Sequence, residues 1–265
     1  SGRRNVVIRN GTVQQFGYGV LLTAGTTHTT IDGVDMFRNA LAGLELFDAD
    51  DGRNGNTVRN SRIADNEVGV QLIGGTEHAV LEDNEIAGNL GEQLLIMGGA
   101  FNRVEGNTFH GIPSDPALDS DGGLLLEGTT DNQLIDNTVR DTGDAAIIIA
   151  EGSHRNRVQG GFYYRNGDAG VIIDASDRNE VVGATAHQQS DGGIVVGEAH
   201  HTVLRDNDVR FNPAGVEASN SNHLVLEGND ASESLQSGFE LSDGVGLRIV
   251  GNTAHRTGAS GIMLE

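Results

Sequence analysis

The chain has no cysteine and no lysine, and it contains only three prolines and 4% aromatic residues. The absence of cysteine excludes disulfide bonds, thiolate nucleophiles and cysteine-ligated zinc sites. No hydrophobic run approaches the roughly 18 residues that a membrane-spanning helix needs, so membrane insertion is not expected. The opening Ser-Gly-Arg-Arg does not resemble a signal peptide, and we interpret the chain as a processed or partial form.

Positive charge is scarce as well. The 17 cationic side chains, all arginines, stand against 38 aspartates and glutamates and give a formal net charge of −21. A chain of this charge repels nucleic acid and anionic membranes, so we expect neither as a partner.

Small and polar residues are abundant, with 39 glycines and many asparagines, aspartates and threonines. This composition is typical of many short strands joined by tight turns. No run of proline, serine or charge marks a boundary between halves. We therefore predict a single domain over residues 1–265.

A repeat runs through the whole chain. Its pattern is an aliphatic residue, two variable residues, Asn, one variable residue and an apolar residue, as in "LEDNEI" at 81–86 and "LIDNTV" at 134–139. An alternating strand follows, such as "GVQL" at 69–72. Eleven copies can be aligned, most of them 22 to 24 residues long. Each copy offers four inward apolar positions, and in one coil we assign the second of these to Phe162.

These features predict an all-β fold, a right-handed parallel β-helix of about 11 coils with three short strands per coil. Asparagines at equivalent positions, such as Asn84, Asn107 and Asn137, should stack at the corners between strands. One copy carries an insertion loop at residues 111–121. No capping helix is evident at either end, so we expect that a cap is missing or that another subunit covers the end.

The repeat, with its "N-T-V" corners and "G-V-x-L" strands, resembles the right-handed parallel β-helix proteins of the pectate-lyase-like superfamily. Within that superfamily, it resembles the periplasmic NosD-type and mannuronan C5-epimerase-type repeats. The resemblance implies a lyase, epimerase or glycoside hydrolase acting on acidic polysaccharide, or a non-catalytic relative, in an extracellular or periplasmic location. The Tyr-Gly-Phe-Asp-Pro-His type of motif of mannuronan epimerases is absent.

Function in a solenoid is sought in outward columns, because residues one coil apart in sequence are neighbours in space. One such column follows the second inward position of each coil. It contains side chains able to donate, accept or stabilise charge: His110, Arg140, Tyr163, His187 and Arg210. Their alternative role is simple packing of arginine and aromatic faces.

A second column contains aspartates three residues before the third inward position, namely Asp121, Asp144, Asp168 and Asp191. Carboxylates spaced by about 5 Å repel by on the order of 1 kcal/mol per pair in water. Pairing with Arg140 or Arg165, a bridging calcium ion, or a retained proton would offset this repulsion. Alternatively, the aspartates only complete turns by bonding to the backbone.

A third column is aliphatic over five coils: Leu95, Leu125, Ile148, Ile172 and Val195. An outward apolar stripe of this length marks a covered surface. It is expected to be the interface of a homo-oligomer, the seat of a missing cap, or the floor of a substrate groove that also uses Arg210.

The sequence thus predicts a polysaccharide-active enzyme of lyase or C5-epimerase type on a uronic-acid glycan. Arg140 or Arg165 would neutralise the substrate carboxylate, and His187 or Tyr163, with His110 nearby, would transfer protons. Asp144 and Asp168 would bind calcium or act as an acid pair, the latter in a glycoside hydrolase. No organic cofactor is expected. The alternative is a non-catalytic binding or assembly module that oligomerises through the apolar stripe.

Overall fold

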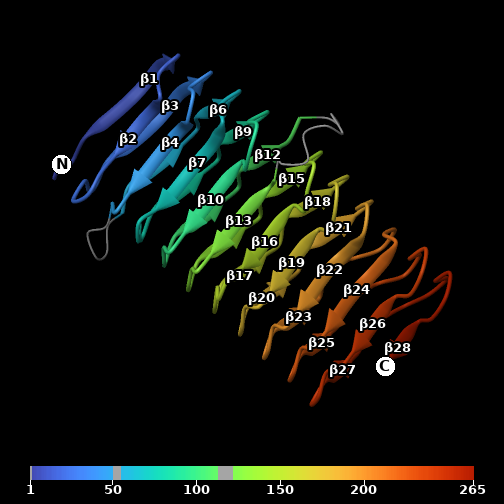
Figure 1. Ribbon diagram of the computed structural model, residues 1–265. Helices are drawn as coiled ribbons and strands as arrows, with labels where there is room; N and C mark the ends of the chain where they lie inside the picture. Colours follow the sequence, from blue (N-terminus) through green and yellow to red (C-terminus); the bar gives the residue numbers. More distant parts are fainter. Residues whose placement is uncertain (1, 50–54, 113–121) are drawn as a thin grey trace.

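The computed structural model describes residues 2–49, 55–112 and 122–265, and it is a rod of stacked coils with the two chain ends at opposite ends (Figure 1). All paired strands run parallel and form two sheets of 11 and 17 strands. Each coil contributes one strand to the smaller sheet, which confirms the predicted parallel β-solenoid of about 11 coils. Among the described residues, no helix is long and apolar enough to cross a membrane.

The 11-stranded sheet consists of β2 (Tyr18–Leu22), β4 (Ala42–Phe47), β7 (Val68–Ile73), β10 (Leu94–Met97), β13 (Leu124–Glu127), β16 (Ile147–Ala150), β19 (Val171–Asp174), β22 (Gly192–Gly197), β24 (Ala214–Ser219), β26 (Phe239–Ser242) and β28 (Ile262–Leu264). The 17-stranded sheet consists of β1 (Val7–Gln14), β3 (Thr30–Phe37), β5 (Thr57–Arg59), β6 (Arg62–Ala64), β8 (Val80–Glu82), β9 (Glu85–Ala87), β11 (Arg103–Glu105), β12 (Thr108–His110), β14 (Gln133–Ile135), β15 (Thr138–Arg140), β17 (Arg157–Gln159), β18 (Phe162–Tyr164), β20 (Glu180–Val182), β21 (Thr185–His187), β23 (Val203–Arg205), β25 (Val225–Glu227) and β27 (Arg248–Val250).

The core follows from the period-two pattern of these short strands. In β11, β14, β17 and β20 the middle residue is aliphatic and points inward, and the residues on either side point outward. The middle residues pair in register from coil to coil, as Val104 with Leu134 and Leu134 with Val158. Each is fully buried. Like residues therefore stack on like residues, and the core is a set of continuous aliphatic columns.

Amide ladders hold the corners. The side chain of Asn84 donates to Asn107 at 2.9 Å, and Asn107 donates to Asn137 at 3.1 Å. At a second corner, Asn102 donates to Asn132 at 3.0 Å, and a third ladder, which the sequence pattern did not reveal, begins with Asn39 donating to Asn66 at 3.0 Å. Farther along the same corner, Asn166 donates to Gln189 at 3.0 Å. Each buried amide thus satisfies the amide of the next coil, which fixes the axial register.

One inward position differs from the prediction by a single residue. Phe162 is 60% exposed, whereas Tyr163 is 1% exposed and pairs with Val139 and Ala186 in the neighbouring coils. Both residues of the Gly160-Gly161 corner have positive φ. This corner keeps the five-residue spacing between inward positions, so the inward residue after Val158 is Tyr163. Tyr163 is therefore a core residue, and its predicted catalytic role is wrong.

Candidate functional site

The outward column beside this core position is in register over four coils. His110 pairs with Arg140, Arg140 with Tyr164, and Tyr164 with His187, at the ends of β12, β15, β18 and β21. Arg210 occupies the same position in the next coil, two residues after Asp208, which bridges to Thr185. We call His110, Arg140, Tyr164, His187 and Arg210 the Arg–His column. Tyr164 replaces the predicted Tyr163 as its outward tyrosine.

At one end of the Arg–His column, an aspartate links its histidine to its last arginine. Nε2 of His187 lies 2.8 Å from Oδ1 of Asp208, and Arg210 donates two hydrogen bonds to the same carboxylate at 2.8 and 2.7 Å. Burial alone would raise the pKa of Asp208, but the bonds from Arg210 and the contact with His187 outweigh it and hold the pKa at about 2. Asp208 is thus a fixed negative charge that orients His187.

Sequence reasoning missed Asp208. The preceding coils have Thr138, Phe162 and Thr185 at the equivalent position, so no run of acidic residues drew attention to it. The only available signal was the position of Asp208, which lies in the coil after His187 and two residues before Arg210.

In the middle of the column, two arginines share one carboxylate. Arg165 donates two hydrogen bonds to Asp141 at 2.8 and 3.0 Å, and Arg140 contacts Asp141 at 2.6 Å. The bonds from Arg165 and Arg140 lower the pKa of Asp141 although burial opposes them. Of the three offsets that the sequence left open for the aspartate column, pairing with Arg140 and Arg165 is thus not the one observed, since both arginines pair with Asp141. Two cations against one anion leave a net positive charge here, in a chain whose overall charge is −21.

Exposed rings border the column. Phe162 and Phe211 are 60% and 47% exposed, and together with Tyr164 and His187 they line a shallow pocket. The ring of Phe211 meets His187 edge-on at 5.4 Å, and the guanidinium of Arg165 lies 5.0 Å from the ring of Tyr164. Rings held in this way offer flat apolar faces between charged groups, which suits a saccharide. Tyr163 lies beneath them, and its burial raises the pKa of its hydroxyl.

At the far end, Nε2 of His110 lies 3.7 Å from Glu85. His110 is in register with Arg140 but two coils away from Tyr164 and three from His187. It extends the column without joining its centre.

The aspartate column lies on the other side of the turn that follows the Arg–His column. Asp144 accepts a hydrogen bond at 2.7 Å from the backbone N–H of Ala145, the next residue, whereas the expected turn bond would come from the residue two positions on. Asp168 is half-buried, and its pKa is raised by burial and by the negative charges of Asp144 and Asp191. Within the described part of the chain, no ion pair reaches these three carboxylates. Asp121, the fourth predicted member, lies outside the described residues.

The calcium prediction is untested. The described residues contain no group of three or more His, Asp or Glu side chains placed to hold a metal ion. The insertion loop predicted at 111–121, with its acidic residues, falls almost entirely outside the described part. Burial and the charges of Asp144 and Asp191 raise the pKa of Asp168, which favours a retained proton as one way to relieve the repulsion.

The pKa shifts predict how stability depends on pH. Asp168 has a raised pKa in the folded chain, so it stabilises the fold when protonated and this contribution is lost as the pH rises through the raised value. Asp208 and Asp141 have lowered pKa values, so their contribution is lost as the pH falls. We expect the melting temperature to rise as the pH falls from 7 through the raised pKa of Asp168, and to fall below about pH 4, the ordinary aspartate range, as Asp208 and Asp141 begin to lose their contribution.

A substitution separates the two effects. Asp168→Asn should raise the melting temperature at pH 7 and reduce its rise on acidification, as followed by circular dichroism; Glu217, whose pKa is also raised, keeps part of the rise. Asp35→Asn, at an exposed position of β3, is the control and should leave the profile unchanged. A melting temperature that falls steadily from pH 7 to pH 5, or one lowered by Asp168→Asn, would contradict the repulsion.

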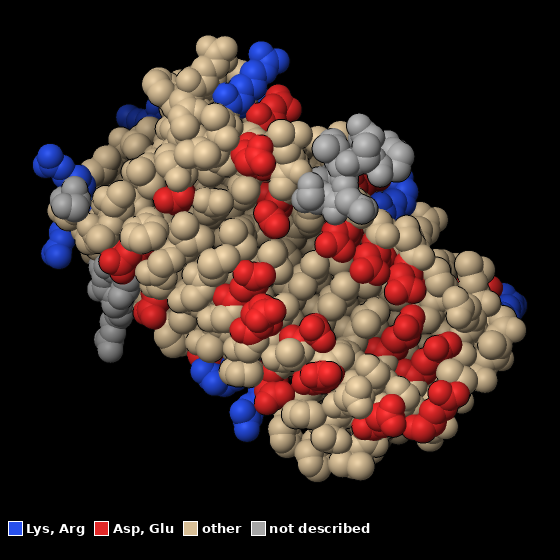
Figure 2. All heavy atoms as spheres, viewed as in Figure 1, with Lys and Arg blue, Asp and Glu red and all other residues tan. Residues whose placement is uncertain are grey.

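The predicted apolar stripe is in register on the 11-stranded sheet. Leu95 pairs with Leu125, and the column continues through Ile148, Ile172 and Val195, all half-buried. Toward the C-terminal end the same column becomes acidic, with Glu217 and Glu240. Figure 2 shows acidic side chains gathered over this face, with the cationic ones at its margins. The interface and substrate roles of the stripe stay predictions.

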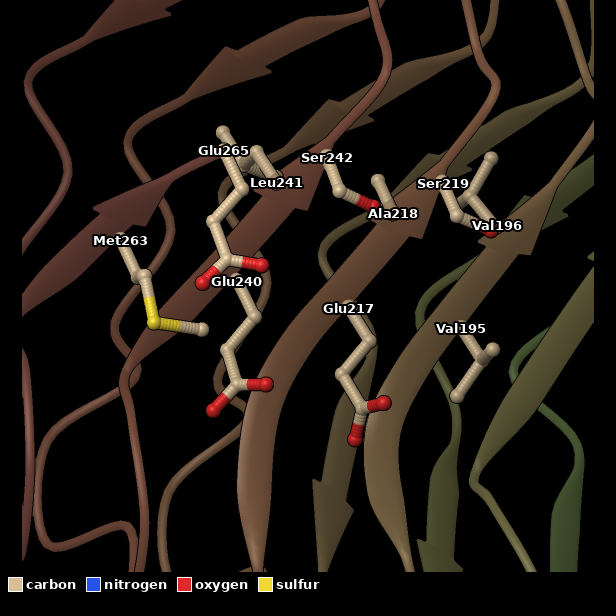
Figure 3. Close-up of a pocket in the computed structure, with 10 residues that line it drawn as sticks. All are labelled: Val195, Val196, Glu217, Ala218, Ser219, Glu240, Leu241, Ser242, Met263 and Glu265. Carbon is tan, nitrogen blue, oxygen red and sulfur yellow. The ribbon is translucent and has the colours of Figure 1, made fainter.

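A pocket lies where the stripe turns acidic. Figure 3 shows Glu217 and Glu240 projecting side by side from neighbouring strands, with Met263 beyond them. The pKa of Glu217 is raised by burial and by the charges of Asp191, Glu240 and Asp168. A face with several uncompensated carboxylates repels an anionic polymer. The structure therefore separates the predicted residues into an acidic face and the Arg–His column, where cations and rings lie together.

Comparisons with solved structures find the same fold. The A-module of a mannuronan C-5 epimerase from Azotobacter vinelandii has a TM-score of 0.74 at 17% identity, covering 99% of this chain and 84% of the other. An α-1,3-glucanase catalytic unit from Streptomyces thermodiastaticus has a TM-score of 0.63 at 17% identity, covering 98% and 60%. A periplasmic alginate epimerase (D317A mutant) has a TM-score of 0.57 at 14% identity, covering 98% and 78%.

Comparison with family models identifies the family. A model described as "Periplasmic copper-binding protein (NosD)" matches residues 160–265. The search of curated proteins gives no match. The model described as "Right handed beta helix region" matches residues 1–109 and 51–209, which together span well over half of the chain. With its stacked parallel coils, the chain belongs to the right-handed β-helix family.

Proposed function

We propose that the chain binds an anionic polysaccharide along the Arg–His column and modifies it by C5-epimerase or lyase chemistry. The main support is that two arginines sharing one aspartate, Arg140 and Arg165, lie within two coils of His187, which contacts Asp208. The likeness in fold to proteins described as mannuronan and alginate epimerases supports the same substrate class. The NosD match supports a periplasmic or extracellular location.

Both reactions begin by removing the proton on the carbon next to a uronate carboxylate. Neutralising that carboxylate makes the proton more acidic, and Arg140 with Arg165 can do this through the charge that Asp141 leaves unpaired. The contact of Nε2 of His187 with Asp208 favours the tautomer in which Nδ1 is the free, basic nitrogen. We assign His187 as the base that accepts the proton.

Tyr164 lies between these groups, paired in register with Arg140 on one side and His187 on the other. Its hydroxyl is the group best placed to deliver a proton from a second direction. Protonation of the carbanion on the opposite face gives the epimer, whereas loss of the C4 substituent, with a proton for the leaving oxygen, gives the unsaturated lyase product. Phe162 and Phe211 would hold the neighbouring sugar rings.

A screen with polymannuronate and polygalacturonate, in the presence of calcium or of a chelator, tests the proposal. Ultraviolet absorbance detects the unsaturated lyase product. Incorporation of deuterium at C5 from deuterated water detects epimerisation. Either signal supports the proposal and separates the two reactions. Binding without either signal would instead assign the chain as a non-catalytic module, and no binding to either polymer would overturn the proposal.

A second candidate function is hydrolysis of a neutral glycan on the acidic face. Asp144 and Asp168 lie one coil apart, about 5 Å, which is the carboxylate separation of retaining glycosidases. The raised pKa of Asp168 beside Asp144 suits an acid and nucleophile pair. The fold is shared with an α-1,3-glucanase. New reducing ends from α-1,3-glucan, abolished by Asp144→Asn, would favour this candidate over the first.

A further inference from the structure

A corner on another edge of the rod has a positive-φ backbone but is occupied mostly by residues other than Gly, Asn or Asp. In seven successive coils, the corner residue that precedes β8, β11, β14, β17, β20, β23 and β25 has a positive φ between 55° and 59°. We call these residues the corner ridge: His78, Phe101, Asp131, Arg155, Arg178, His201 and His223. They are neighbours along the axis, since the N–H of Asp131 donates to the carbonyl of His154 and that of Arg155 to the carbonyl of Asp177.

Positive φ is strained for side chains with a Cβ and is least so for Gly, Asn and Asp. The same seven coils show what this chain uses at another positive-φ corner, five residues later, where only Gly and Asp occur: Asp83, Gly106, Asp136, Gly160, Gly183, Asp206 and Gly228. The corner ridge has rings and guanidinium groups in six of its seven positions. Similar side chains occur at the positive-φ corner beside the Arg–His column, as at Arg165 and Phe211, so in this chain they accompany a candidate binding surface.

The ridge side chains contact one another along the axis. His78 stacks on Phe101 at 5.3 Å, and His201 stacks on His223 at 4.9 Å. Arg155 donates two hydrogen bonds to Asp131, at 2.9 and 2.7 Å. The ridge is thus a row of three contacting pairs with Arg178 between the second and third, about 30 Å long over six steps between coils.

The centre of the ridge has an excess of positive charge. A shallow groove there is lined by Phe101, Asp131, Arg155, Arg157, Arg178 and Glu180, among others. Arg155 is paired with Asp131, and Arg157 is paired with Glu180 at 2.6 Å. Arg178 is exposed, and its guanidinium forms no ion pair with any residue in the described ranges. One arginine therefore remains available beside an exposed phenylalanine ring.

We propose that the corner ridge is a second binding track, on which a linear anionic polysaccharide lies along the rod axis. The spacing between coils, about 4.8 Å, is close to the length of one sugar residue, so successive rungs can meet successive sugars. Rings would pack on sugar faces, Arg178 would bind carboxylate or sulfate groups, and Arg155 would neutralise Asp131 beside it. At physiological salt the charge of the acidic face is screened beyond about 8 Å, so it does not prevent binding here.

The track rests on the proposed function only for the class of ligand, because it uses no residue of the Arg–His column. Its role would be to hold a long chain while the column acts on it, as linked binding sites raise the local concentration of a ligand. Failure of one site does not imply failure of the other, and the experiment below measures them separately.

Binding is tested by isothermal titration with polygalacturonate, dextran sulfate and neutral dextran on the full chain. Arg155→Asn with Arg178→Asn should weaken binding of the anionic polymers by about tenfold or more. The control Arg59→Asn with Arg62→Asn removes the same charge at exposed positions of β5 and β6 and should change affinity less than about twofold. Neutral dextran should not bind measurably. Binding of only one anionic polymer would show whether carboxylate or sulfate is the group bound.

Two further measurements keep the result interpretable. Asn tolerates positive φ better than Arg, so the ridge double variant should melt at the same temperature as the parent chain or higher. A lower melting temperature with unchanged affinity would make the ridge structural. Turnover of a short uronate oligomer should be unchanged in the ridge variant, because such a substrate reaches the Arg–His column alone. Equal loss of affinity in the ridge and control variants, or no loss in either, would overturn the proposal.

Discussion

His187→Ala is expected to reduce turnover of a uronate polymer by about 10²- to 10⁴-fold, the range typical for loss of a general base. The imidazole is held by Asp208 at 2.8 Å and lies in the pocket with Tyr164 and Phe211. Removing it leaves the Asp208–Arg210 pair intact, since Arg210 is bound through its own two hydrogen bonds. The fold and the affinity for polymer should therefore change little while the rate falls.

A matched control is available in the same column. His255 occupies the equivalent position two coils beyond Arg210, and it lines a different pocket with Ser232 and Arg256. His255→Ala should keep turnover within about twofold, since a proton donor or acceptor must lie within hydrogen-bond reach of the reacting carbon. Initial rates at saturating polymer measure the effect on both variants. Equal losses in the two, or full activity of His187→Ala, would show that His187 is not the base.

The inward columns could be predicted because burial constrains them in every coil. A polar side chain at Val104, Leu134 or Val158 would be buried without a partner, so only apolar residues occur there and the repeat becomes visible in the sequence. The same reasoning predicted the ladder through Asn84, Asn107 and Asn137 but not the one that begins at Asn39, where Gln189 also takes part. The periodicity of the sequence thus predicted the fold and the positions of the three outward columns.

Pairing between outward side chains could not be predicted in this way. Arg140 and Arg165 have several carboxylates within reach, and solvent satisfies whichever they do not use. The sequence favoured Asp144 and Asp168 because they repeat, whereas the structure pairs both arginines with Asp141, which has no such regular column. For the same reason Asp208 was missed. The site depends on individual pairs between coils, and these leave no periodic signal.

The two neighbouring tyrosines show how finely the assignment of a site depends on register. Hydropathy allows either Phe162 or Tyr163 at the inward position, and it favours Phe162 because phenylalanine is the more apolar residue. Spacing was the better criterion, because Leu134 to Val139 and Val158 to Tyr163 are both five residues apart. Tyr163 therefore fills the core, and the neighbouring Tyr164 meets the solvent beside Arg140 and His187.

Tyr163→Ala should consequently lower the free energy of unfolding by about 3–5 kcal/mol, as measured by urea denaturation. The ring is fully buried between Val139 and Ala186, so its removal leaves a cavity in a close-packed column. Tyr164→Ala, at a half-buried outward position, is the control and should cost less than about 1 kcal/mol. Similar losses in the two variants would contradict the register.

The paired phenylalanine variants extend this test from stability to function. Tyr163→Phe removes only the hydrogen bond from the hydroxyl to the carbonyl of Gly160, at 3.2 Å, and should cost about 1 kcal/mol with full activity. Tyr164→Phe should keep the fold and lose at least about tenfold in turnover, because the proton it delivers can then come only from water. If Tyr163→Phe were instead the inactive variant, the buried hydroxyl would have to reach substrate through the closed core, and the assignment of the outward face would be wrong. Because the two substitutions differ by one position in β18, they compare the inward and outward faces of the same strand with the same chemical change.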